Sequence, residues 1–130
     1  MSGSSSILAA FNNHFIEFVN DIHRVFPDDV DIMTAKNSMI ALRKINPKII
    51  IKSWDLFVVG KYKSVIESGD IRFFMDKDYS SDLSKNPNSK KIMDAIDRLR
   101  EPVKMMNLEE RTKIVKYIQN LTKLSEIYKQ

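Results

Sequence analysis

The 130-residue chain has no cysteine, and it has only three glycines and four prolines. Without cysteine the protein cannot form disulfides, use a thiol nucleophile, hold an iron–sulfur cluster or ligate zinc through thiolates. No apolar run approaches the roughly 18 residues of a membrane-spanning helix, and residues 1–6 lack the basic segment of a signal peptide. We therefore expect a soluble intracellular protein that is not secreted and has no membrane span.

The sequence also lacks the motifs of common active sites, so we expect a protein that is not an enzyme and has no cofactor. It contains no Gly-x-Ser-x-Gly, His-Glu-x-x-His or Gly-x-Gly-x-x-Gly motif. Its two histidines, His14 and His23, lie on one predicted helix at a spacing that puts them on opposite faces. They cannot share a metal ion or act as a pair within that helix.

One polar stretch partly matches a calcium-binding loop. Four residues occupy odd-numbered ligand positions of such a loop: Asp76, Asp78, Ser80 and Asp82. The position that needs glycine is Ser81, and the position that needs a bidentate glutamate is Pro87. We therefore expect no metal ion, and we interpret residues 76–89 as a polar loop suited to movement or to ordering by a partner.

Apolar residues spaced by threes and fours predict an all-α protein. We expect one domain over residues 7–130 with six to seven short-to-medium helices, preceded by a flexible segment at 1–6. The first helix has Ser5 or Ser6 as its N-cap and ends at Pro27. The aspartates at 28, 29 and 31 suit the N-terminus of a second helix, which explains them without a metal ion. The apolar arc of this second helix is Ile32, Ala35, Met39, Leu42 and Ile45.

Stop and start signals divide the middle of the chain. Asn46 and Pro47 predict the start of a third helix that ends near Gly60, although the isoleucines within residues 48–52 also suit a β-strand. We expect Gly69 in the left-handed conformation at the end of a helix over 61–68. Asp70 is then the cap of a further turn.

Two helices are predicted after the polar loop. Glu101 and Pro102 are expected to interrupt the first of them. Asn107 and Glu110 have the spacing of a capping box and predict the start of the last helix. Its apolar arc is Leu108, Ile114, Val115, Ile118, Leu121 and Tyr128.

Adjacent phenylalanines beside the polar loop are the predicted protein-interaction residues. On a short helix, Phe73 and Phe74 cannot both point the same way, so at least one is expected to face outward. Together with Tyr79 they would form an exposed aromatic surface. In the alternative interpretation, a central short helix has both faces buried.

The net charge of +4 comes from the C-terminal third of the chain. There Lys113, Lys116 and Lys123 fall within about 80° of one helix face, a stripe that could contact phosphates. Glu109 shares that face, as on an ordinary solvated helix. The stripe is therefore predicted either to be solvated or to bind an anion such as nucleic acid.

Three stretches resemble a family of short, largely uncharacterised helical proteins encoded by nucleocytoplasmic large DNA viruses, the giant viruses. They are VFPDDVDI at 25–32 running into TAKN at 34–37, GDIRFFMDKDYSSD at 69–82, and YIQNLTKLSEIY at 117–128. The resemblance covers roughly residues 11 to 128 and contains no catalytic signature. It implies a virion-associated or assembly role and assigns no site residues.

These observations lead to one main expectation and two alternatives. The main one is a non-enzymatic viral structural protein, a minor capsid or assembly component that contacts other capsid or core proteins. Such a protein would be found in the virion or in the cytoplasm of the infected cell. The first alternative is a nucleic-acid-binding accessory of viral transcription or genome packaging that uses the basic C-terminal third. The second is a regulator that binds a host protein.

Overall fold

The computed structural model describes residues 2–75 and 87–129. The described residues form helices joined by short turns and contain no strand, which confirms the all-α prediction. The elements in chain order are α1 (Ser2–Val25), α2 (Val30–Ile45), α3 (Ile49–Ser53), the π-helix η1 (Trp54–Val59), α4 (Gly60–Ser68), α5 (Arg72–Met75), α6 (Pro87–Lys104) and α7 (Leu108–Lys129).

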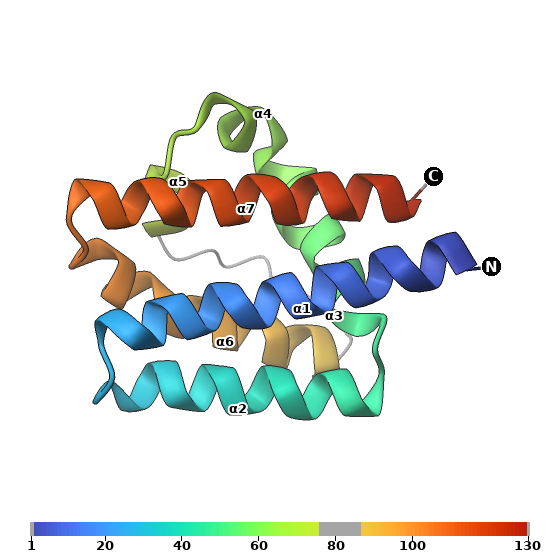
Figure 1. Cartoon of the computed structure of the whole chain (residues 1–130), viewed down its shortest axis with the longest axis horizontal. Coiled ribbons are helices and arrows are strands. Elements are labelled where there is room, and N and C mark those ends of the chain that lie inside the picture. Colours follow the sequence, from blue (N-terminus) through green and yellow to red (C-terminus); the bar gives the residue numbers. More distant parts are fainter. Residues whose placement is uncertain (1, 76–86, 130) are drawn as a thin grey trace.

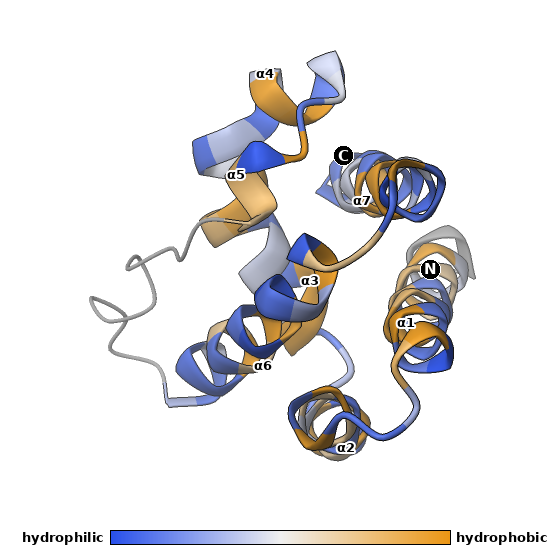
Figure 2. Cartoon of the chain, turned by 90° about the vertical axis from the view of Figure 1, so that its left-hand side faces the viewer, coloured by the Kyte–Doolittle hydropathy of each residue, from blue (hydrophilic) through white to orange (hydrophobic). Residues whose placement is uncertain are grey.

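Four long helices make up most of the molecule. α1 packs against α7 on one side and against α2 on the other, and α2 packs in turn against α6. Figure 1 shows these helices running lengthwise, with the α1–α2 and α6–α7 turns at one end. The end-on view in Figure 2 shows α4 and α5 beyond α6 and α7, on the side away from α2.

Several helix ends form as their sequences predict. The Asp29 carboxylate accepts hydrogen bonds from the backbone N–H groups of Asp31, at 2.8 Å, and Ile32, at 3.2 Å. Gly69 has a φ of +80°, the left-handed conformation expected at the end of α4. The capping box at Asn107 is complete, because the Asn107 and Glu110 side chains each accept a bond from the other's backbone N–H.

Other boundaries differ from the predictions. α1 begins at Ser2, so Ser5 and Ser6 lie inside the helix and do not cap it. Gly60 has an ordinary right-handed conformation with φ −58°, so the helix continues through it into α4. Pro102 does not interrupt α6, because it lies in the last turn of the helix and little helix follows it.

The starting residues of α3 and α6 also differ from the predictions. The third helix begins at Ile49, and residues 49–53 therefore form a helix and not a strand. The Asn46 side chain accepts a hydrogen bond from the backbone N–H of Lys48, just before the helix. α6 begins at Pro87, so residues 87–89 belong to a helix and not to the predicted loop. Residues 76–86 lie outside the described residues.

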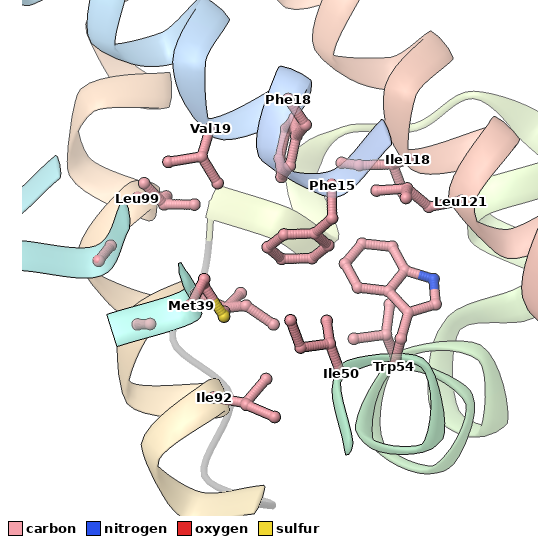
Figure 3. Packing of buried hydrophobic residues seen from close by; sticks show 14 of the residues in the cluster. Phe15, Phe18, Val19, Met39, Ile50, Trp54, Ile92, Leu99, Ile118 and Leu121 are labelled. Carbon is pink, nitrogen blue, oxygen red and sulfur yellow. The ribbon is translucent and has the colours of Figure 1, made fainter. Parts of the chain in front are cut away.

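An aromatic cluster occupies the centre of the core. Trp54 lies edge-on to Phe15 with ring centroids 5.8 Å apart, and Phe15 lies edge-on to Phe18 at the same distance. Figure 3 shows these rings surrounded by aliphatic side chains from α2, α3, α6 and α7. The buried indole N–H of Trp54 donates to the Thr122 hydroxyl at 3.2 Å, so it is not left without a partner. This core fixes the positions of the surface residues on the four long helices.

Candidate interaction surfaces

Phe74 belongs to the core and not to the surface. Its side chain is only 2% exposed, and its ring packs edge-on to Phe18 at 6.1 Å. The buried guanidinium of Arg100 donates to the Phe74 carbonyl at 2.6 Å and lies 5.4 Å from the Phe74 ring. These contacts hold α5 against α6. The prediction that Phe74 contacts a partner is therefore wrong, because its ring is buried within the chain.

Phe73, the residue before Phe74, is half-buried. Its ring lies 5.1 Å from the ring of Tyr62 on α4, and it packs against the edge of the core. The turn before it is fixed by Asp70, whose carboxylate accepts bonds from the backbone and guanidinium of Arg72. Those hydrogen bonds lower the pKa of Asp70 to about 2. Tyr79, the third predicted contact residue, lies outside the described residues.

The lysines of the basic stripe lie together on α7. Lys113, Lys116 and Lys123 are all exposed, and none of them forms an ion pair with a described residue. Glu109 is exposed on the same face. The structure therefore places three ammonium groups along one side of α7, where an anion can reach them.

A polar cluster links α1 to α7 beside this stripe. The ring of His14 lies 4.8 Å from the ring of Tyr117, and its Nδ1 is 3.5 Å from the carboxylate of Glu17. The Tyr117 hydroxyl donates to the carboxylate of Asp21, which also pairs with Arg24. Burial and this hydrogen bond raise the pKa of Tyr117 to about 12, so the hydroxyl stays a donor at neutral pH. Apart from His14 Nε2, which is buried without a partner, these groups bind one another.

The two histidines have separate partners, as their spacing predicts. His14 faces Tyr117 and Glu17, whereas Nε2 of His23 lies 3.1 Å from the Pro27 carbonyl oxygen. Across the described ranges 2–75 and 87–129, no group of three or more His, Cys, Asp or Glu side chains is placed to hold a metal ion. The four residues that resemble calcium ligands lie outside these ranges.

Three exposed apolar side chains lie at the end of the bundle where α1 and α6 finish and α7 begins. Met105 is 76% exposed, Leu108 is 82% exposed and Val25 is 37% exposed. Val25 also lines a cavity of about 130 Å³ with Met106 and Ile114, which places the end of α1 beside the α6–α7 turn. We call Val25, Met105 and Leu108 the bundle-end patch. Contiguous exposed apolar patches are typical of interaction sites, and these three residues are the candidates for one at this end of the bundle.

Sequence reasoning missed the bundle-end patch. It places Leu108 in the apolar arc of the last helix with Ile114 and Leu121, but Leu108 is exposed where those two are buried. The same error affects Ile45, which is 71% exposed at the end of α2. A helical wheel could have predicted that Leu108 is exposed, because this residue lies about 120° from the buried Ile114.

A shallow groove lies between α2 and α6. Its volume is about 360 Å³, and its α2 side is formed by Thr34, Ser38, Ala41, Leu42 and Ile45. Its α6 side carries Lys91, Asp94 and Arg98 around Ala95. Arg98 pairs with Asp31 at 2.7 Å, whereas Lys91 and Asp94 form no ion pair with any described residue. The α2 side is therefore uncharged, and the α6 side has both signs of charge.

No model of a protein family, no curated protein and no solved structure matches the chain. Within the part of the chain that the structure describes, no helix has the length and apolar character needed to cross a membrane.

Proposed function

We propose that this chain is a non-enzymatic interaction protein, a virion-associated minor capsid or assembly component that acts through protein–protein contacts. The observation that carries the proposal is the bundle-end patch, where Met105 and Leu108 are about three-quarters or more exposed. Covering large apolar side chains that are exposed to water lowers the free energy, so a partner that buries them is stabilised on this surface. The viral setting, in the particle or in the cytoplasm of the infected cell, rests on the family resemblance.

The patch suits a protein partner because of its chemistry. Methionine side chains adapt to irregular apolar surfaces, and leucine adds a fixed apolar contact. Phe73 could add a second contact on the α5 side, since its ring is only partly covered by Tyr62. The two surfaces would then contact other viral proteins, in a capsid or in a core.

Incorporation into virus particles tests this proposal. Quantitative mass spectrometry of purified, nuclease-treated virions should find the chain at a fixed ratio to the major capsid protein. The double variant Met105→Asp/Leu108→Asp should reduce that ratio at least about tenfold, because it places charge in the contact. The matched control is Leu56→Asp/Ile127→Asp, which changes apolar residues that are 67% and 49% exposed elsewhere. Presence in infected-cell lysate but not in particles would contradict the proposal.

The alternative function is a nucleic-acid-binding accessory of viral transcription or genome packaging. It is favoured by the three exposed lysines of α7, which have no acidic partner among the described residues. Phosphate contacts release counterions, so affinity should fall steeply as salt rises. Replacing Lys113, Lys116 and Lys123 by alanine should lower the slope of log K against log salt by about 2 to 3. Affinity that does not depend on salt would exclude this alternative.

A further inference from the structure

One row on the exposed side of α6 carries four charges in alternating order, and the exposed Lys90 lies beside it, about 20° beyond Glu101. Lys91, Asp94, Arg98 and Glu101 are all exposed, and their 3-4-3 spacing keeps them within about 80° of one face. The order is therefore positive, negative, positive, negative. Two of them have weak internal partners, because Arg98 pairs with Asp31 at 2.7 Å and Glu101 pairs with Lys104 at 3.1 Å at the surface.

This row is complementary to itself when it is turned end over end. The midpoint of the row lies level with Ile96. A second row running antiparallel about that point places Lys91 opposite Glu101 and Asp94 opposite Arg98, and the symmetry repeats both pairs. A parallel second row in the same register would put like charges opposite one another. The pattern therefore distinguishes one orientation from the other.

The neighbouring side of α2 has an uncharged strip with the same symmetry, flanked at about 40° by Asp31 and Lys44. Val30, Thr34, Ala41 and Ile45 fall within about 60° of one side of this helix. Their midpoint lies beside Ser38, and Ser38 lines the same groove as Ala95, next to the midpoint of the α6 row. One axis can therefore pass close to both midpoints. Val30, 73% exposed, would then face Ile45, 71% exposed, in the second copy.

We propose that the chain self-associates through this α2–α6 face, as an antiparallel dimer with a two-fold axis across both helices. A two-fold contact uses the same patch on both copies, which is the arrangement that the two symmetric rows satisfy. α2 would lie on the partner's α2, with small residues in the middle and Ile45 at each end. α6 would lie on the partner's α6, with the charged rows paired.

The size of the face fixes the expected strength of the dimer. A 16-residue helix is about 24 Å long, and two helices about 10 Å apart give a face of about 500 Å² per copy. The total of about 1,000 Å² is at the lower limit for a specific interface. The dimer should therefore be reversible, and it should weaken at high salt because its paired charges lie at the surface.

Sedimentation velocity of the full chain at low salt tests this proposal, over concentrations from about 1 µM to about 1 mM. The 15.1 kDa chain should shift towards twice that mass as its concentration rises. Lys91→Glu should weaken the dimer about tenfold or more, because it puts like charges in contact twice. Glu101→Lys should do the same. Lys116→Glu, the same change on the exposed face of α7, is the control and should leave the dimer unchanged.

Mixing the two single variants gives the sharpest test. In an equimolar mixture, the new carboxylate at position 91 of one copy would face the new ammonium group at position 101 of the other. The symmetry-related contact would keep its original pair of charges, so a heterodimer of near wild-type affinity should form. A wild-type chain that stays monomeric at every concentration would overturn the proposal. So would a dimer that Lys91→Glu leaves unchanged, or a mixture that stays monomeric. The self-association does not depend on the proposed function at the bundle-end patch.

Discussion

The α1–α7 pair and the α2–α6 pair use their surface polar groups in different ways. Between α1 and α7, the Tyr117 hydroxyl donates to Asp21, and the Tyr117 ring lies tilted against that of His14. Between α2 and α6, a single described ion pair, Arg98 with Asp31, crosses the groove, while Lys91 and Asp94 form no ion pair with a described residue. The first set of polar groups is used to join helices of the same chain, and the second is available to an outside partner.

Apolar packing beneath the two pairs differs less than their polar surfaces do. Phe18 of α1 and Met39 of α2 are both 0% exposed, so each pair contributes to one core. The difference lies at the rim of each pair, by which we mean the side chains where the core meets solvent. At the α1–α7 rim the half-buried Tyr117 covers the core, whereas at the α2–α6 rim Ile45 projects into solvent. We therefore expect substitutions at the first rim to change stability and substitutions at the second to change association.

The largest effect is expected in the core under the α1–α7 pair. Phe18 contacts the rings of Phe15, Phe74 and Tyr117, and Phe18→Ala should lower the free energy of unfolding by about 3–5 kcal/mol because it leaves a cavity. Urea denaturation followed by circular dichroism measures this change. Phe73→Ala, the same change at a half-buried ring, should cost about 1 kcal/mol. Equal losses from the two variants would contradict the difference in burial between the two rings.

An intermediate effect is expected at the α1–α7 rim. Tyr117→Phe should lower the free energy of unfolding at pH 7 by about 1–3 kcal/mol, because it removes a hydrogen bond to a charged group. The pKa of Tyr117 is raised to about 12 in the folded state, against about 10 for an ordinary tyrosine. The folded state therefore favours the protonated phenol. This contribution is fully present below pH 10 and is lost as the pH rises from 10 to 12.

Two measurements follow the pH dependence of Tyr117. Urea denaturation at pH 8 and at pH 11 should show the difference between wild type and Tyr117→Phe becoming smaller at the higher pH. Absorbance near 295 nm should show one of the four tyrosines of the wild type ionising late, and Tyr117→Phe should lack that phase. Identical absorbance titrations of the two proteins, apart from one missing chromophore of ordinary pKa, would contradict the raised pKa.

The smallest effect on stability is expected at the α2–α6 rim. Ile45→Lys should change the free energy of unfolding by less than about 0.5 kcal/mol, because the side chain is 71% exposed. Leu42→Lys, three residues earlier on the same helix and 3% exposed, is the matched comparison and should unfold the protein. Thermal denaturation of both variants at low concentration separates these outcomes. A large loss of stability from Ile45→Lys would mean that this rim contributes to the fold.

The sequence predicts those parts of the fold that depend on local chemistry. Asp29, Gly69 and the Asn107–Glu110 box act through side chains or backbone angles within a few residues, so each can be recognised from its neighbours alone. The all-α class follows from periodicity in the same way.

The remaining features depend on tertiary contacts. Phe74 faces the core because its ring packs against Phe18 of α1 and Arg100 of α6, which are both distant in the sequence. Ile45 lies in the last turn of α2 and Leu108 in the first turn of α7, and both are exposed in the folded chain. The two-fold charge pattern on α6 is visible in the sequence, but the uncharged strip of α2 beside it is known only from the packing.

The π-helix between α3 and α4 sets the phase of a continuous run of helix. A π-turn encloses one more residue than an α-turn, and here it lets both Trp54 and Val59 face the core. Removing one residue from this segment, at the exposed Leu56, would let the wide turn close to an ordinary α-turn with α3 and α4 still in phase. Ile66 would then keep its place in the core. The wide turn thus accommodates the extra residue locally and leaves the helices before and after it in rotational agreement.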